Sequence, residues 1–139
     1  MPHTTRLSVR WSDLDALGHL NNAAYLTLCE EARIDALTTL FPAWWTETYS
    51  PVVASASLQF KRPITAPGPV LVTVGFDPPG RSSLRMTYSI ATENAPDAVC
   101  AESDSVLVWV DLSTGSSMPI PDGLRDALRQ HSPESRTHE

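Results

Sequence analysis

Alternation of apolar and polar side chains is the strongest pattern in the chain. It occurs in four segments, which are residues 5–11, 52–60, 70–76 and 84–90, and a fifth segment, residues 99–110, is apolar on both faces after Ser105. A period of two is typical of a β-strand, because successive side chains of a strand point to opposite faces. Residues 78–82 and 93–97 carry turn formers and separate the third, fourth and fifth segments at hairpin spacing. We therefore expect the last four segments to form an antiparallel sheet.

Both faces of this predicted sheet carry apolar residues. In the second segment one face is expected to hold Val52, Ala54, Ala56, Leu58 and Phe60. The other face of the sheet still carries Val53, Leu71, Val106, Val108 and Val110. A sheet that is apolar on both faces favours association of several copies. Gly75, in the third segment, indicates a β-bulge.

One segment follows the period of a helix instead. Between residues 22 and 41, positions three and four apart are apolar, namely Tyr25, Leu28, Cys29, Ala32, Ala36 and Leu40. This spacing predicts an amphipathic helix with Asn21 or Asn22 as its N-cap, which ends before Pro42. A shorter helix is expected over 123–130, followed by a polar tail.

The order of strand, long helix and four strands predicts an α+β architecture, in which the helix covers one face of a single sheet. The chain has 139 residues, the usual length of one domain. We assign residues 1–112 to this domain. Residues 113–139 are then a C-terminal extension of the same domain, with the short helix and the tail.

Composition and charge exclude several classes of protein. The chain is 42% hydrophobic and 19% charged, which excludes a disordered protein. It has no apolar run long enough for a membrane helix and no signal-peptide pattern. Ten basic and 16 acidic residues give a net charge of −6, so neither nucleic acid nor a membrane is an expected partner. Cys29 and Cys100 are too few for a disulfide scaffold or a zinc knuckle, and reduced thiols indicate the cytoplasm.

The loop at residues 11–22 leads from the first strand into the long helix and holds the groups capable of chemistry. A helix N-terminus presents unpaired N–H groups that can stabilise a developing oxyanion. A carboxylate beside it, from Asp13 or Asp15, could act as general base or nucleophile on the same carbonyl. Asp and Asn before a helix are also common turn and cap residues, so both interpretations stay open.

Residues 9–26 read Val-Arg-Trp-Ser-Asp-Leu-Asp-Ala-Leu-Gly-His-Leu-Asn-Asn-Ala-Ala-Tyr-Leu, and residues 30–33 read Glu-Glu-Ala-Arg. Together with the segment 54–64, they strongly resemble the hot-dog-fold acyl-CoA thioesterases of the 4-hydroxybenzoyl-CoA thioesterase type. The resemblance implies a curved antiparallel sheet of about five strands wrapped around one long central helix. It also implies homodimers that join their sheets edge to edge, often homotetramers, with the active site at the dimer interface.

The implied reaction is hydrolysis of an acyl-CoA thioester to a free carboxylic acid and CoA. No metal and no cofactor are implied, since coenzyme A is part of the substrate. The resemblance assigns the catalytic carboxylate to Asp15, three residues before Gly18, as nucleophile or as general base for water. Asp13 is then the expected turn or cap acceptor. Because this family takes oxyanion donors from the backbone near the helix start, oxyanion stabilisation or substrate positioning is expected from Gly18, His19, Asn22 and Tyr25.

Three alternatives stay open. Related acyl-carrier-protein thioesterases have an Asn two residues after the Asp and a His four after it; this chain matches the His with His19 but has Leu17 in the Asn position. A related clade places a catalytic Glu on the helix, which makes Glu30 and Glu31 candidates, although their spacing from Arg33 is typical of a solvated face. The protein could also be a non-catalytic acyl-binding hot-dog module.

An acidic protein needs local positive charge to bind the phosphates of CoA. Lys61 and Arg62 follow the second strand, and Arg81 and Arg85 lie around the next hairpin. We treat these four as candidate phosphate contacts, each of which could equally be an ordinary surface cation.

Overall fold

The computed structural model describes residues 2–131, so the expected polar tail from residue 132 lies outside the described residues. The helices and strands, in chain order, are β1 (His3–Val9), α1 (Asn22–Leu40), β2 (Tyr49–Phe60), β3 (Gly68–Phe76), β4 (Ser83–Thr92), β5 (Val99–Asp111) and α2 (Asp122–His131). Two short 3₁₀ turns, Trp11–Asp13 and Pro42–Trp44, flank α1.

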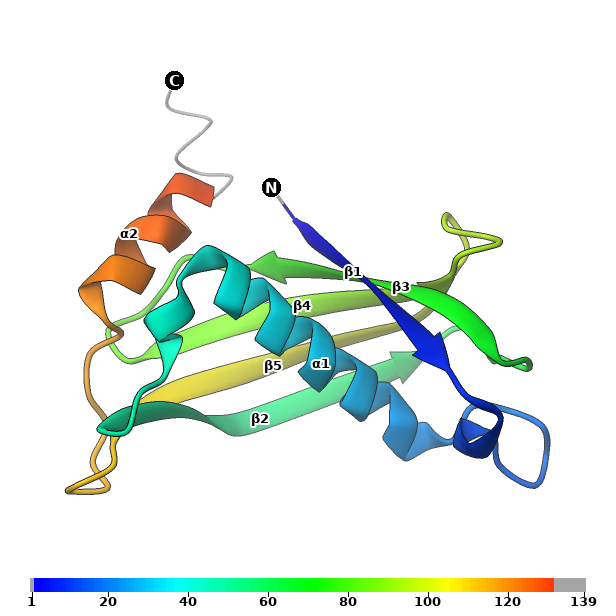
Figure 1. Ribbon diagram of the computed structural model, residues 1–139, viewed down its shortest axis with the longest axis horizontal. Coiled ribbons are helices and arrows are strands. Elements are labelled where there is room, and N and C mark those ends of the chain that lie inside the picture. Colours follow the sequence, from blue (N-terminus) through cyan, green and yellow to red (C-terminus); the bar gives the residue numbers. More distant parts are fainter. Residues whose placement is uncertain (1, 132–139) are drawn as a thin grey trace.

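The five strands form one antiparallel sheet in the order β1-β3-β4-β5-β2, so β1 and β2 are its edges (Figure 1). Strands β3, β4 and β5 pair as successive hairpins, as the turn spacing predicts. The long helix α1 crosses one face of the curved sheet, here called the inner face (Figure 1). The predicted α+β hot-dog arrangement is therefore confirmed.

The hydrophobic core lies between α1 and the inner face of the sheet. Alternate residues of the central strands are buried there, among them Val72, Val74, Leu84, Met86, Ile90, Leu107 and Trp109. On the helix, Ala32 and Ala36 are fully buried, and their small side chains let α1 approach the strands closely. Leu37 is also buried and adds to the apolar face that the helical period predicts.

Local chemistry explains where α1 begins and ends. The side chain of Asn21 accepts a hydrogen bond of 2.9 Å from the Ala23 N–H, so Asn21 is the N-cap. The helix ends at Leu40, one residue before the predicted limit, and Pro42 starts the following 3₁₀ turn. The second helix, α2, buries Leu124 and Leu128 in the same core as α1 and the sheet.

Two predicted details of the strands are wrong, the end of the first strand and the bulge at Gly75. The first strand ends at Val9, because the 3₁₀ turn Trp11–Asp13, with Arg10 as its N-cap, takes the chain out of the sheet. Trp11, expected as its last inward residue, is 79% exposed. Gly75 forms no bulge and pairs in regular register with Thr87. Glycine is favoured at this position for another reason, because a Cβ at Gly75 would lie only 2.6 Å from the Thr87 hydroxyl.

The alternation predicted for β2 breaks at a bulge. The register against β5 shifts between Val53 and Ser55, which leaves Ala54 without a partner across the strands. Before the shift Val53 lies opposite the buried Leu107, on the inner face, and Val52 lies opposite Val108. Val52 therefore does not share a face with Ala56, Leu58 and Phe60, and Val53 is not an outer residue, because one inserted residue reverses the order of the faces.

Two findings bear on the classes excluded from the sequence. Cys29 and Cys100 are both free and buried, and burial raises the pKa of the Cys29 thiol, as expected for inert thiols. Within residues 2–131, neither helix combines the length and the apolar character needed to cross a membrane.

Candidate active site

Residues 14–20, here called the Asp15 hairpin, fold back on themselves between β1 and α1. Leu14 and Leu20 form an antiparallel bridge, and the Asp15 N–H donates to the His19 carbonyl at 2.8 Å. The turn closes when the Gly18 N–H donates to the Asp15 carbonyl at 3.0 Å. Gly18 has a φ of +79°, in the left-handed region that favours glycine. The hairpin is thus a defined structure rather than a loose connection.

The Asp15 hairpin is hydrogen-bonded to the segment that follows β2. The Leu20 N–H donates to the Ile64 carbonyl at 2.7 Å, and Ile64 is itself buried. One turn into α1, the buried Tyr25 ring meets the Phe60 ring edge-on, with centroids 5.1 Å apart. Burial raises the pKa of Tyr25, so its hydroxyl stays protonated at neutral pH. These contacts place the end of β2 beside the predicted site.

The Asp15 carboxylate is held by one of its two oxygens. Its Oδ1 accepts hydrogen bonds from the Leu17 N–H at 2.9 Å and the His19 N–H at 3.2 Å. Among the described residues, no hydrogen bond reaches Oδ2, and the residue is exposed. One oxygen therefore fixes the orientation of the group, while the other is available to a water molecule or a substrate carbonyl.

The first turn of α1 supplies a backbone donor seven residues after Asp15 in the chain. The Ala23 N–H is capped by the Asn21 side chain, and the Ala24 N–H donates to the Asn21 carbonyl at 2.9 Å. Within residues 2–131, the Asn22 N–H has no hydrogen-bond partner. An open N–H at the positive end of a helix is suited to stabilise an oxyanion. Of the residues predicted to position substrate, Asn22 thus offers an open backbone donor.

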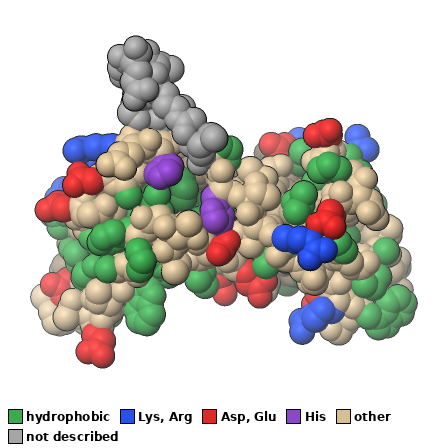
Figure 2. Space-filling model, turned by 45° about the horizontal axis from the view of Figure 1, so that its top comes forward, with side chains coloured by type: hydrophobic (Ala, Val, Ile, Leu, Met, Phe, Trp, Pro, Cys, Tyr) green, Lys and Arg blue, Asp and Glu red, His purple; other side chains and the backbone are tan. Residues whose placement is uncertain are grey.

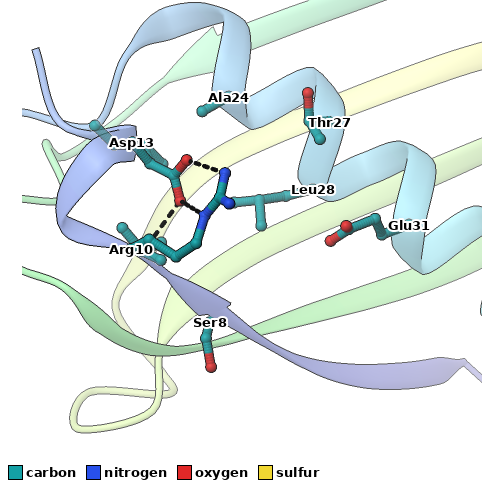
Figure 3. Close-up of a pocket in the computed structure, with 9 residues that line it drawn as sticks. Ser8, Arg10, Asp13, Ala24, Thr27, Leu28 and Glu31 are labelled. Carbon is teal, nitrogen blue, oxygen red and sulfur yellow. Dashed lines mark hydrogen bonds and ion pairs between the residues drawn. The ribbon is translucent and has the colours of Figure 1, made fainter.

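Asp13 acts as a turn acceptor, as the sequence predicts. Its carboxylate accepts from the Arg10 N–H at 2.8 Å and from the Arg10 guanidinium at 3.0 Å (Figure 3). The hydrogen bonds from Arg10 hold the pKa of Asp13 below its usual range. Arg10 and Asp13 form one rim of a cavity of about 350 Å³ between β1 and α1, which Glu31 also lines. Figure 3 shows the Arg10 guanidinium and the Asp13 carboxylate turned toward each other.

The four candidate cations are not gathered in one place. Lys61 and Arg62 follow β2, close to the Ile64 carbonyl that fastens the Asp15 hairpin. Lys61 pairs with Glu102 at 3.4 Å, and Arg62 lines a cavity of about 330 Å³. Arg81 lies in the β3–β4 turn, at the opposite end of the sheet from the hairpin (Figure 1).

Arg85 lies on the outer face of the sheet and is already neutralised there. Its guanidinium pairs with Asp77 at 3.0 Å and with Asp104 at 2.8 Å, and Ser57 also donates to Asp104. The structure thus brings Lys61 and Arg62 to the end of the sheet that carries Asp15, and does not bring Arg81 and Arg85 there. On the face drawn in Figure 2, acidic and basic side chains are interspersed, with no large basic patch.

Arg33 differs from the solvated position that its spacing suggests. Only 14% of its side chain is exposed, and its guanidinium donates to the Tyr88 hydroxyl at 3.4 Å, beside an ion pair of 3.8 Å with Glu30. The Tyr88 hydroxyl also bonds to Ser105 at 2.7 Å, so a buried polar row underlies the middle of α1. The alternation of residues 84–90 places Tyr88 on the same face as Leu84 and Met86, but the sequence does not show that Arg33 reaches it.

A family model described as the thioesterase-like superfamily matches residues 9–128. The long-chain acyl-CoA thioesterase FadM of Escherichia coli (strain K12) is 28% identical over 128 residues, covering 91% of this chain and 96% of FadM. A solved structure of a thioesterase complexed with coenzyme A and Zn, from Thermus thermophilus, is 36% identical, with a TM-score of 0.78 and 91% of each chain covered. The PA2801 protein of Pseudomonas aeruginosa is 33% identical, with a TM-score of 0.84, covering 91% of this chain and 97% of that one. The chain therefore belongs to the thioesterase-like superfamily.

Proposed function

We propose that this protein hydrolyses acyl-CoA thioesters to a free carboxylic acid and coenzyme A. The observation that carries the proposal is that one short segment holds both a fixed Asp15 carboxylate and an open Asn22 N–H at the start of α1. The acyl-CoA thioesterase FadM and the coenzyme A complex of the T. thermophilus thioesterase support CoA as the thiol carrier.

The geometry is compatible with two routes that consume one water molecule each. In the nucleophilic route an Asp15 oxygen attacks the carbonyl carbon and the C–S bond breaks, which leaves a mixed anhydride on Asp15 and a CoA thiolate. Water then hydrolyses the anhydride, and the proton released in this step reaches the CoA thiolate. In the general-base route Asp15 takes a proton from water as the water oxygen attacks, and the proton passes to sulfur as the C–S bond breaks. In both routes the Asn22 N–H stabilises the carbonyl oxygen as it gains negative charge.

Other members of the site shape it without taking part in bond changes. Gly18 and His19 form the turn that holds the Asp15 carboxylate, His19 through its backbone N–H and carbonyl. Tyr25, packed on Phe60, forms the wall behind the first turn of α1. The proposed reaction uses no metal and no cofactor, and coenzyme A enters as part of the substrate.

A second copy of the chain is proposed to complete the site along β2. This edge strand exposes Val52, Val53 and Phe60 by about half, and Phe60 touches Tyr25 of the site. Apolar exposure of this kind on an open edge favours pairing with another copy. We expect a homodimer or homotetramer at micromolar concentration by sedimentation velocity. An active monomer would contradict a site shared between subunits.

Changing Lys61 and Arg62 together to Ala is expected to raise KM for acyl-CoA with little change in kcat, because both cations would meet phosphate rather than the reacting carbonyl. Two screened charge contacts of up to about 1 kcal/mol each correspond to a rise in KM of up to about thirtyfold. Steady-state kinetics check this. An acyl-N-acetylcysteamine thioester, which lacks the nucleotide, is the control and should be unaffected. Equal loss on both substrates would mean that the pair is structural.

A panel of acyl-CoA substrates, assayed for free thiol, tests the proposed function and identifies the preferred acyl group. Matched acyl-carrier-protein thioesters, assayed alongside, separate the runner-up activity from the proposed one. Faster turnover of the carrier thioester would reassign the substrate while leaving the chemistry in place. Thiol release from neither series, with acyl-CoA still bound, would favour a non-catalytic acyl-binding module.

A further inference from the structure

Asp13 links three parts of the chain that converge at the Asp15 hairpin. Its carboxylate accepts the Arg10 N–H at the end of β1, at 2.8 Å, and the Arg10 guanidinium at 3.0 and 3.3 Å. Its backbone carbonyl accepts the Asn21 N–H at 2.9 Å, and Asn21 is the N-cap of α1. One residue thus joins the end of the first strand, the base of the hairpin and the start of the helix.

The path from Asp13 to the Asp15 carboxylate is short and made of hydrogen bonds. Asp13 and Asn21 close the base of the loop, and the Leu14–Leu20 bridge is the next rung toward its tip. The third rung is the bond from the Asp15 N–H to His19, whose own N–H donates to the Asp15 carboxylate. A displacement at the base of this ladder therefore moves the donors that orient the carboxylate.

The Arg10–Asp13 ion pair is expected to contribute little to the stability of the fold. The Arg10 side chain is 75% exposed and the Asp13 side chain 20% exposed, so solvent screens the guanidinium, and an ion pair screened in this way contributes little to the free energy of unfolding. A bidentate contact between guanidinium and carboxylate does, however, fix relative orientation. The contribution of this pair is therefore expected in geometry rather than in stability.

We infer that Asp13 is a positioning residue, which together with Arg10 sets where the Asp15 carboxylate lies relative to the first turn of α1. The inference rests on the proposed function, because Asp15 is the group whose placement it controls. It assigns different roles to the two carboxylates of the loop: Asp15 reacts, and Asp13 holds the hairpin that carries it.

Asp13→Ala is expected to lower kcat between about tenfold and a hundredfold with little change in KM, since displacement of a catalytic group by about 1 Å can cost that much. Asp13→Asn keeps an oxygen that accepts the Arg10 N–H and loses only the second oxygen of the guanidinium contact, so it should lose much less of kcat than Asp13→Ala and retain most of the rate. The matched control is Glu93→Ala, which also removes a carboxylate paired with an arginine, in this case Arg6 of β1, whose Nε–H donates to Glu93 at 2.5 Å. This control should leave kcat unchanged.

Two further readouts separate positioning from a merely structural effect. In an Asp15→Asn background, Asp13→Ala should cause no additional loss of kcat, because the group that it positions is already disabled. Amide hydrogen exchange of folded Asp13→Ala should be faster at Leu17 and His19, whose N–H groups hold the Asp15 carboxylate.

Unchanged exchange at Leu17 and His19, or full additivity of Asp13→Ala with Asp15→Asn, would overturn the inference. If the wild type released no thiol, the proposed function would fail while the exchange measurement still decided the positioning role. If Asp13→Ala kept the wild-type kcat in an active protein, the positioning role alone would fail.

Discussion

Asp15→Asn is expected to lower kcat by about 10²–10⁴-fold, the usual loss when a general base is removed. The Asn side chain keeps the size of Asp and an oxygen that accepts from the Leu17 and His19 N–H groups, but it can neither take a proton nor attack as an anion. KM should change little, because the backbone donor of Asn22 and the binding contacts remain. Steady-state thiol-release kinetics of the purified variant check the expectation.

Asp13→Asn is the matched control for Asp15→Asn. It changes a carboxylate two residues away in the same loop and should keep most of the activity. Circular dichroism and sedimentation must show that both variants keep their fold and assembly. If folded Asp15→Asn kept most of its kcat, Asp15 would not be the catalytic carboxylate. Glu31, which lines the cavity beside Arg10, and Glu30, which is paired with Arg33, would be the next candidates.

Trp109→Ala is expected to reduce the free energy of unfolding by about 3–5 kcal/mol, the usual cost of removing a large aromatic from a core. Trp109 is 0% exposed, and its indole N–H donates to the Trp44 carbonyl at 2.9 Å, which ties β5 to the turn after α1. Since whole domains are stable by only about 5–15 kcal/mol, the loss should be plain in urea unfolding. All variants must be compared at one protein concentration, because assembly adds to apparent stability.

Trp109→Phe separates packing from the hydrogen bond. It keeps most of the apolar volume and loses the donor, so its cost should be smaller than that of the Ala variant. A Trp109→Ala protein that unfolded within about 1 kcal/mol of the wild type would show that the core near Trp44 is far less tightly packed than its burial indicates.

The architecture could be predicted because each element has its own hydrophobic period and its own capping or turn residues. Alternation locates the strands, three-and-four spacing locates α1, and Asn21 and Pro42 set its limits. The β2 bulge could not be predicted, because Ala54 reads as one more small residue in an alternating run. The opposite placement of Val52 and Val53 depends on the register against β5, which is a property of two strands together.

The candidate site could likewise be predicted only in part from the sequence. The motif is what makes Asp15 the candidate carboxylate, and this assignment stays a prediction. The open N–H of Asn22 could not be predicted, because every residue other than proline has a backbone N–H and only the capping pattern shows which one is open. The separation of Lys61 and Arg62 from Arg81 and Arg85 needs the sheet order and strand register, which place the two pairs differently. The burial of Arg33 could not be predicted for a similar reason, since its contact with Tyr88 joins residues 55 positions apart.

Free CoA thiol and free carboxylic acid, measured per acyl-CoA consumed by the wild-type protein, decide whether the chain is a thioesterase. The proposal predicts one thiol and one carboxylic acid for each thioester lost, at a rate well above that of the same mixture without protein. Acyl-CoA that is bound, or altered in its acyl chain, while its thioester stays intact would contradict it.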